Sequence, residues 1–436
     1  MGSLFLSIAG FAAVLVLAGA RVPLAFALGI VGALGTGYVK GWDTFIFVAG
    51  SAPFEILNNY SLSVLPLFIV MGAFAVQTGL AAELVRTANA FMGHYRGGLA
   101  MGSVMSCAVF GAVSGSNLAT LSTMGSIAIP EMLKRGYSAR LAAATLASAS
   151  TLDILIPPSI QMVIYSMMTE TSIGRMMAGG VVPGIILTLL FIVAIRLWIL
   201  KSPGIAPAPA PPVPWRERLP LLKSIGGVAV VFGAMMGGMY AGVFSPTEAA
   251  AVGAVGTLAV GIIQRRLSWT GFVASVREAV QLSAIVYLIL IGIALFHFFM
   301  DSVGLQREVT QTLTALRLPA WGVMAIILIG LILLGCVMDS TAILFITTPF
   351  LFPIVVGLGF DPIWFGIVMV MVIQLGLIHP PFGLNVFILA SMHREIKVVD
   401  TFWGCAPFVI ADVVLILMVC VFPGIILWLP NLMFQS

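Results

Sequence analysis

Two stretches of this sequence, 223 residues apart, interrupt apolar sequence in the same way. The first, residues 111–165, breaks at VSGSN (113–117) and at IPPS (156–159). The second, about residues 334–388, breaks at MDST (338–341) and at HPPF (379–382). At this single offset, and without a gap, Pro130 aligns with Pro353, Gly136 with Gly359, and Pro157 with Pro380. The chain therefore contains a repeated pair of broken apolar segments.

The composition places these breaks inside a membrane protein. Hydrophobic residues make up 61% of the chain and charged residues only 8%, whereas about a quarter of the residues in soluble domains are charged. Apolar runs of roughly 20 residues, the length that crosses a bilayer, recur along the chain, so we expect about a dozen membrane segments. Unwound backbone at membrane depth is tolerated only where it is buried in protein or lines a cavity, so the repeated breaks predict a transport site.

Each break divides its segment into parts that are short for a span. We expect re-entrant helical hairpins at residues 97–130 and 320–356, because each half is too short for a hydrocarbon core about 30 Å thick. Residues 142–168 and 362–392 are predicted to be transmembrane helices broken at Pro-Pro, because proline removes a backbone donor and clashes with the preceding turn. The predicted division is scaffold helices at 1–96 and 181–319, transport repeats at 97–180 and 320–400, and a C-terminal helix at 401–436.

The Pro-rich segment at residues 201–218 is predicted to be an extended cytoplasmic linker. An even number of expected crossings separates the two Pro-Pro steps, so the second broken helix runs opposite to the first and the repeats are inverted. All Lys and Arg residues then lie on one side except Lys40, Arg175, Arg307 and Arg317. The crowded side is predicted to be cytoplasmic. Both termini then lie outside, and one hairpin enters from each side.

The net charge of +4 is explained by this positive-inside bias and does not indicate a nucleic-acid partner. The four cysteines, Cys107, Cys336, Cys405 and Cys420, lie within apolar runs and have no metal-ligand spacing. We expect them to be small core residues.

Several motifs follow one another along nearly the whole chain: GSNLATLSTMGSIAIPEMLKRGYS, ILIPPSIQMVIY, AGGVVPG, GVFSPTEAAAVGA, MDSTAILFITTPFLFPIVVGLGFDPIWFGIV and GLIHPPFGLN. In order and spacing they resemble the large membrane (M) subunit of tripartite ATP-independent periplasmic (TRAP) transporters, the DctM-like family. Two residues depart from the family pattern. Asp153 stands where a small residue, often glycine, precedes the first Pro-Pro step, and His379 stands where threonine is usual before the second.

The resemblance implies a sodium-driven importer of small organic anions in the bacterial inner membrane, and not an enzyme. It implies an all-α polytopic fold of the elevator type, with a transport domain built from the two hairpins and the two broken helices. It also implies two protein partners, which are a small four-helix membrane subunit and a periplasmic substrate-binding protein. It further implies that membrane lipid surrounds the protein and that the anion is a carboxylate or a sulfonate.

The two hairpin tips are expected to meet near the middle of the membrane. Helix N-termini there offer N–H groups and a positive dipole end to an anion, whereas carbonyls and hydroxyls of opened backbone suit a small hard cation such as Na⁺. The predicted sodium ligands are Ser114, Gly115, Ser116, Asn117, Pro157, Ser159, Asp339, Thr341, Pro380 and Gly383. The predicted substrate-binding residues are Ser116, Asn117, Asp153, Ser340, Thr341, His379 and Asn385.

Purely structural roles fit several of these residues as well. Asp339 suits a helix cap as much as a cation ligand, because Asp is a preferred N-cap residue. The prolines suit an ordinary kink in a membrane helix. His379 suits an anion donor, a proton pathway or a hydrogen-bonded core histidine. Glu248 is expected to cap the start of a span.

Other functions fit parts of the pattern. A stand-alone carrier would work without a binding protein, driven by an ion or by protons through Asp153, Asp339 and His379. An intramembrane serine hydrolase would use Ser114 with His379 as its base, but the sequence offers no oriented third group. A channel would not need two inverted hairpins. Anions that fit the predicted site include C4-dicarboxylates, sugar acids, 2-oxo acids and small sulfonates.

Overall fold

The structure, a computed structural model, describes residues 2–305, 319–336 and 338–434, and this part of the chain contains helices and no strand. The predicted all-α fold is confirmed. Two of the cations expected opposite the crowded side, Arg307 and Arg317, lie outside the described residues. The helices are α1 (Gly2–Gly19), α2 (Leu24–Lys40), α3 (Trp42–Leu57), η1 (Tyr60–Ser63), α4 (Val64–Gln77), α5 (Leu80–Met92), α6 (Gly98–Ser114), α7 (Asn117–Lys134), α8 (Ala139–Ala149), α9 (Leu152–Leu155), α10 (Ile160–Met168), α11 (Ile173–Lys201), η2 (Pro203–Ile205), α12 (Trp215–Tyr240), α13 (Pro246–Ile263), α14 (Trp269–Val303), α16 (Ala320–Gly335), α17 (Ser340–Gly357), α18 (Pro362–Gly376), α19 (Leu384–Met392), α20 (Val398–Val421) and α21 (Gly424–Met433).

Fewer helices than the predicted dozen are long enough to cross a membrane alone. Among the described residues, 7 helices meet that length and apolarity, or 8 if the bent pair 139–155 and 160–168 forms one span. The difference arises because several apolar runs are divided into helices of 10–17 residues, such as α2, α6, α16 and α18. Breaks and turns therefore take up much of the apolar sequence.

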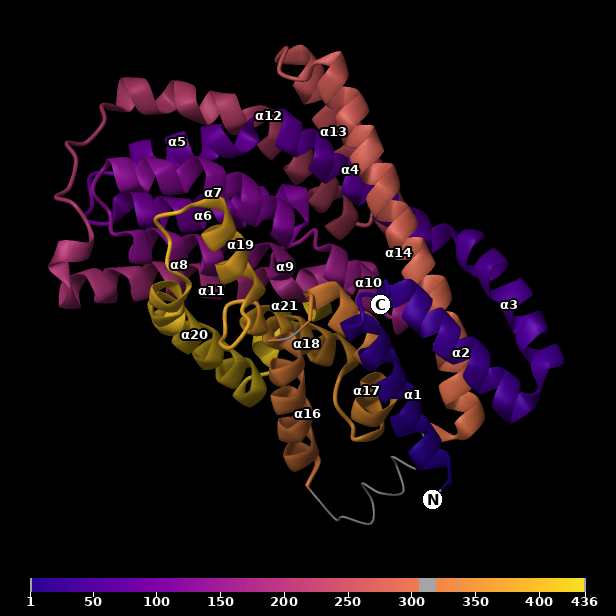
Figure 1. The fold of residues 1–436 in the computed structure, drawn as a ribbon. Helices are drawn as coiled ribbons and strands as arrows, with labels where there is room; N and C mark the ends of the chain where they lie inside the picture. Colours follow the sequence, from indigo (N-terminus) through magenta and orange to yellow (C-terminus); the bar gives the residue numbers. More distant parts are fainter. Residues whose placement is uncertain (1, 306–318, 337, 435–436) are drawn as a thin grey trace.

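One group of helices is organised around α14, a helix of 35 residues. It packs along α2 and also contacts α1, α3, α4 and α17, and Figure 1 shows it running beside α2 and α4. The contact with α2 is close because glycines lie in it: a Cβ on Gly32 would stand 2.6 Å from the Leu295 carbonyl carbon, and one on Gly292 would stand 2.4 Å from the Ala25 oxygen. Small residues allow membrane helices to approach in this way.

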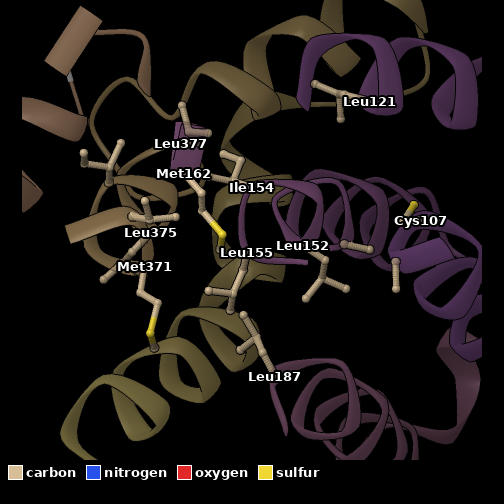
Figure 2. Packing of buried hydrophobic residues seen from close by; sticks show 14 of the residues in the cluster. Cys107, Leu121, Leu152, Ile154, Leu155, Met162, Leu187, Met371, Leu375 and Leu377 are labelled. Atoms are coloured by element: carbon tan, nitrogen blue, oxygen red, sulfur yellow. The ribbon is translucent and has the colours of Figure 1, made fainter. Parts of the chain in front are cut away.

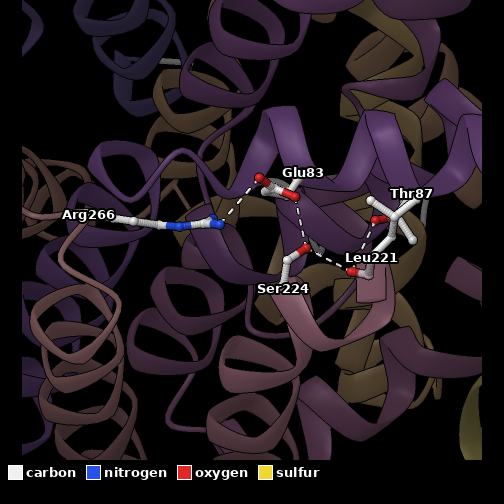
Figure 3. Close-up of polar contacts among 5 residues, drawn as sticks. All are labelled: Glu83, Thr87, Leu221, Ser224 and Arg266. Carbon is white, nitrogen blue, oxygen red and sulfur yellow. Dashed lines mark hydrogen bonds and ion pairs between the residues drawn. The ribbon is translucent and has the colours of Figure 1, made fainter. Parts of the chain in front are cut away.

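Polar contacts join α5 to α12 and to the loop after α13 (Figure 3). Glu83 accepts hydrogen bonds from Ser224 Oγ at 2.8 Å and from Arg266 Nη2 at 3.3 Å. Thr87 Oγ1 donates to the Leu221 carbonyl at 3.4 Å, one turn further along α5. These bonds hold α12 and the loop after α13 against α5.

A second group of helices surrounds the first Pro-Pro break. Figure 2 shows Leu152, Ile154 and Leu155 of the short α9 packed among side chains of α10, α11 and α18, and all three are fully buried. Because lipid tails are as apolar as these side chains, close van der Waals packing holds this region together more than removal from water. The broken segment therefore lies in protein.

The Pro-rich linker contains the short 3-10 helix η2 and is otherwise without regular secondary structure up to residue 214, and it is hydrogen-bonded to neighbouring loops. Arg96 Nη2 donates to the Pro203 carbonyl at 2.7 Å, the Ser138 amide to the Ile205 carbonyl at 2.9 Å, and the Ala210 amide to the Gly93 carbonyl at 3.2 Å. The predicted end of the linker at residue 218 is too late. Helix α12 begins at Trp215, directly after the last proline of the run, and proline is well accommodated just before a helix.

Two minor predictions are borne out. Glu248 forms a capping box with Ser245, whose amide donates to Glu248 Oε2 at 2.8 Å. Cys107, Cys336 and Cys405 are buried, whereas Cys420 is partly buried.

Candidate functional site

The first predicted tip is a tight turn between α6 and α7. Helix α6 ends at Ser114, Gly115 follows with φ +62, and Ser116 caps α7 by accepting a hydrogen bond from the Ala119 amide at 3.4 Å. Glycine suits the left-handed backbone at position 115 because it has no Cβ. The Ser114 hydroxyl lies 2.8 Å from Thr120 Oγ1, so a bond within the turn already engages this side chain.

This tip is held between α4 and the first Pro-Pro step. A Cβ on Gly72 of α4 would lie only 2.3 Å from the Ser114 carbonyl oxygen. On the other side, a Cβ on Gly115 would lie 3.5 Å from the Pro158 carbonyl oxygen. Two predicted ligand groups, the tip and the Pro-Pro backbone, therefore lie side by side.

The second predicted tip begins α17. Asp339 has extended backbone and its carboxylate accepts a hydrogen bond from the Thr341 amide at 2.9 Å, so it caps the helix. Of the two roles expected for Asp339, helix cap or cation ligand, the structure shows the cap. The side chain nevertheless remains exposed, with oxygen lone pairs free for a further ligand.

Both tips line one cavity of about 360 Å³. Its other walls come from α4, α10, α14 and α19. The predicted site residues on its surface are Ser114, Gly115, Ser116, Asn117, Asp339, Ser340 and Thr341. The volume lies at the lower end of the range of about 300–1,000 Å³ for small-molecule sites. Segments more than 200 residues apart in the chain are therefore brought together as expected from the repeat.

A pair of asparagines joins the first tip to the second broken segment. Asn117 Nδ2 donates to Asn385 Oδ1 at 2.8 Å, and Asn385 Nδ2 lies 3.2 Å from Asn117 Oδ1. Asn385 Nδ2 also lies 3.0 Å from the Ala147 carbonyl and 3.1 Å from Ser150 Oγ. Both amides are buried. Asn385 does not line the cavity, but it is hydrogen-bonded to Asn117, which does.

The first broken segment has a second interruption that the sequence analysis missed. Helix α8 ends at Ala149 and α9 begins at Leu152, before the expected break at Pro157 and Pro158. Ser150 Oγ donates to the Ala147 carbonyl at 3.0 Å, and Thr151 Oγ1 to the Ser148 carbonyl at 2.8 Å. Such local bonds compete with helical ones. The run of serine and threonine in ASAST (147–151) is the sequence feature that could have predicted this interruption.

At the Pro-Pro step itself, Ser159 is already engaged. Its hydroxyl donates to the Ile154 carbonyl at 2.6 Å, and so satisfies a group that the proline leaves without a helical partner. The Pro157–Pro158 and Pro380–Pro381 peptide bonds are both cis. Neither Pro157 nor Ser159 lines the cavity.

Asp153 lies away from the cavity, in the contact between α6 and α9. It is 0% exposed, and a Cβ on Gly111 would stand 2.4 Å from the Asp153 Cβ. Neither carboxylate oxygen has a hydrogen-bond partner in the part of the chain that the structure describes. The offset of 223 aligns Asp153 with Gly376, whose own added Cβ would stand 2.4 Å from the Gly335 carbonyl carbon. A carboxylate thus occupies a packing position that holds glycine in the second repeat.

His379, Pro380 and Gly383 lie outside the cavity as well. The Nδ1 atom of His379 is 2.6 Å from the Pro380 carbonyl and 3.6 Å from Cys336 Sγ. Gly383 is buried under Phe402, whose Cε1 would be 2.4 Å from an added Cβ. The arrangement does not pair His379 with Ser114, so the constellation that a serine hydrolase needs is not assembled.

The sequence of residues 11–425 matches the family described as "Tripartite ATP-independent periplasmic transporter, DctM component". The chain belongs to this family. It is 36% identical over 382 residues to the C4-dicarboxylate TRAP transporter large permease protein DctM of Pseudomonas aeruginosa, which covers 87% of this chain and 88% of that protein. The resemblance seen in the motifs is confirmed.

Two further proteins place this TRAP permease in context. It is 32% identical to the isethionate TRAP transporter permease protein DctMQ of Oleidesulfovibrio alaskensis over 85% of this chain and 58% of that protein. Its fold is similar to the crystal structure of the Alcanivorax borkumensis YdaH transporter, with a TM-score of 0.65, 12% sequence identity, and coverage of 88% of this chain and 89% of that one. The latter match concerns the fold alone.

Two polar residues of the permease cavity were missed by the sequence analysis. Gln161 of α10 and Glu278 of α14 both line it. Gln161 lies two residues after Ser159, whose hydroxyl is 3.3 Å from Gln161 Oε1. Glu278 comes from outside both repeats, and no motif marks it. Its carboxylate adds a second negative group to the cavity beside Asp339, an arrangement that favours a bound cation.

Proposed function

We propose that this permease imports a small organic anion by Na⁺-coupled, elevator-type transport. In this proposal the anion is delivered by a periplasmic substrate-binding protein, and the permease works with a small four-helix membrane subunit in the bacterial inner membrane, with both termini in the periplasm. The observation that carries the proposal is the shared cavity. Residues 114–119 and 339–341, from the two predicted hairpin tips, line the same space of about 360 Å³.

The cavity suits an anion because two helices begin at it. Helix α7 starts at Asn117 and α17 at Ser340, and both residues are on its lining. Helix N-termini carry unpaired N–H groups and a partial positive charge. The described lining holds no Lys or Arg, so these helix ends would take the place of a fixed cation. Carboxylate and sulfonate groups both present the oxygen acceptors that N–H groups bind, in line with the C4-dicarboxylate and isethionate of the two relatives' names.

Oxygen atoms at the two tips suit sodium. The Ser114 carbonyl faces Gly72 of α4, the Pro158 carbonyl lies beside Gly115, and the hydroxyl-bearing residues Ser116 and Thr341 line the cavity. Asp339 and Glu278 supply carboxylates. Sodium bound among these oxygens would offset the negative charge that otherwise repels an anionic substrate, and this mutual dependence would couple the two.

The position of the cavity supports an elevator movement. One wall is formed by α4 and α14, which belong to the predicted scaffold, and the opposite wall by tips and broken segments of the two predicted transport repeats. Movement of the second wall past the first would carry the site across the membrane. The alignment covers only 58% of the DctMQ relative. The rest of that protein is long enough to contain a second component.

The proposal is tested with proteoliposomes that contain the full permease and its small subunit, with anion-loaded binding protein outside. Replacing external Na⁺ by choline at a constant pH gradient should abolish uptake. Uptake that persists in choline would sink sodium coupling and favour protons. Omitting the binding protein should also abolish uptake, whereas a stand-alone carrier would continue to transport the free anion.

A further inference from the structure

A second cavity, of about 610 Å³, lies between α11 and α20. It is lined by Arg140, Lys201 and two tryptophans, Trp198 and Trp403, and otherwise mainly by apolar side chains of the two helices. Lys201 is the last residue of α11, and the lining extends back along this helix to Leu190, a length of roughly 16 Å at 1.5 Å per residue. The cavity is therefore a groove with cations towards one end and an apolar wall, and none of the predicted site residues lines it.

The structure holds Arg140 at this groove without an acidic partner. A Cβ on Gly404 of α20 would be 3.1 Å from Arg140 Cγ, so the helix backbone packs directly against the arginine stem. The guanidinium carbon lies 5.5 Å from the ring centre of Trp198. In the described part of the chain, the ion pairs are Arg135–Glu131 and Arg266–Glu83. Arg140 and Lys201 are thus uncompensated, and Asp400, in the first turn of α20, does not line the groove.

The wall of the groove faces the surroundings of the protein. Val193, Leu197 and Ile410 are 50%, 60% and 63% exposed, so no other helix of the described chain covers this wall. Trp403 is 68% exposed at the cationic end, and tryptophan prefers the boundary between headgroups and acyl chains. The same end carries Lys201 and Arg140, which lie on the side predicted to be cytoplasmic. Basic pockets between membrane helices on this side recognise anionic headgroups.

We propose that this groove binds an anionic glycerophospholipid. Its phosphate lies between Arg140 and Lys201, its glycerol region lies at the two tryptophans, and one acyl chain runs along the apolar wall formed by α11 and α20. A free phosphate ion would use only the cationic end and leave the wall unexplained. The length and apolar character of the wall therefore favour a lipid as the source of the anionic group.

Native mass spectrometry of the purified full-length permease tests this assignment. The probes are phosphatidylglycerol and phosphatidylcholine with identical acyl chains. The parent protein should retain phosphatidylglycerol in preference. The double variant R140Q/K201Q should bind it more weakly, by roughly fivefold for each cation removed. The matched control R216Q/K223Q removes two exposed cations of α12 that do not line the groove, and it should bind as the parent does.

A second readout uses the tryptophans. Phosphatidylglycerol with dibrominated acyl chains should quench the fluorescence of the parent, and the W198F/W403F variant should lose that part of the quenching. An excess of inorganic phosphate should not displace the lipid. Equal melting temperatures of R140Q/K201Q and the control establish that both are folded.

Several results would overturn the assignment. One is equal retention of the two lipids by the parent, and another is undiminished retention of phosphatidylglycerol by R140Q/K201Q. Displacement by inorganic phosphate would reduce the groove to a simple anion site. A two-chain species that persists in lipid-free detergent and is lost in Leu197→Glu would show that a second copy of the chain covers the groove instead.

Discussion

Asn117 and Asn385 bond to each other through their side-chain amides, with Asn117 Nδ2 2.8 Å from Asn385 Oδ1, although 268 residues separate them in the chain. One residue starts α7 at the first tip, and the other lies just beyond the second Pro-Pro step. The pair thus links the tip in the first stretch of the sequence repeat to the segment after the Pro-Pro step in the second. A movement of the first tip alone would therefore have to break these hydrogen bonds.

Replacing Asn385 by Ala should destabilise the permease and impair uptake. The change removes bonds to Asn117, Ala147 and Ser150 and leaves buried polar groups unpaired, at a cost of about 1–3 kcal/mol. Thermal unfolding of the purified protein and uptake into proteoliposomes measure the two effects. Asn58→Ala, at an exposed position, is the control and should alter neither. An N385A protein with parental stability and uptake would show that the pair is dispensable.

Replacing Gly72 by Ala should displace the first tip. The new Cβ would stand 2.3 Å from the Ser114 carbonyl, so α4 and the tip must move apart, and such overpacking costs about 1–3 kcal/mol. We expect at least a tenfold loss of uptake, since a displacement of about 1 Å at a site has effects of this size. Gly330→Ala of α16, which meets nothing within 4 Å, provides the comparison. Normal uptake by G72A would mean that the tip tolerates the shift.

Two substitutions of Asp339 separate its capping role from its role toward sodium. Asn caps a helix about as well as Asp does, so D339N should keep the melting temperature of the parent. It removes the negative charge, however, and should weaken the dependence of uptake on Na⁺ concentration. D339A should lose the bond to the Thr341 amide as well and be less stable by about 0.5–2 kcal/mol. If D339N transports with an unchanged sodium dependence, Asp339 is only a cap.

Asp153→Ala should leave uptake within about twofold of the parent and should not lower stability. The carboxylate is buried, has no hydrogen-bond partner among the described residues and does not line the cavity, and a buried unpaired polar group costs free energy. Small side chains suit the position, because Gly111 packs directly against it. Uptake assays at several pH values test this expectation. A variant that folds normally but loses uptake would contradict this expectation and show that Asp153 takes part in transport, as a proton or cation carrier.

The helix ends at the two tips could be predicted because local chemistry fixes them. Ser116 and Asp339 are capping residues at the points where apolar sequence stops, and both cap helices in the structure. The Pro-Pro steps likewise interrupt their helices, because proline lacks a backbone N–H and clashes with the preceding turn in any helix. The meeting of the tips at one cavity followed from the repeat alone.

What could not be predicted depends on contacts between distant segments. The carbonyl of Ala147 finds a partner in Asn385, and this bond forms only when the two repeats are assembled. Glu278 reaches the cavity through the packing of α14 on α4, and its neighbours in sequence give no sign of that position. Asp153 was expected to bind substrate because it precedes a break by one turn, but the side of α9 that it occupies faces α6. The spacing of residues predicted the break at Pro157 and Pro158, but it did not predict which way the Asp153 side chain points.

The Pro-rich linker sets a mechanical limit on the proposed movement. It is fastened to the loop after α5 through Gly93 and to the loop after α7 through Ser138, by way of Ala210 and Ile205. Five residues lead from Ile205 to Ala210, and each spans at most about 3.6 Å, so the two attachment points can lie at most roughly 18 Å apart. If α7 moves relative to α5, the linker must either release one hydrogen bond or stop the movement. In the proposed elevator movement, this short segment would limit how far α7 can travel relative to α5.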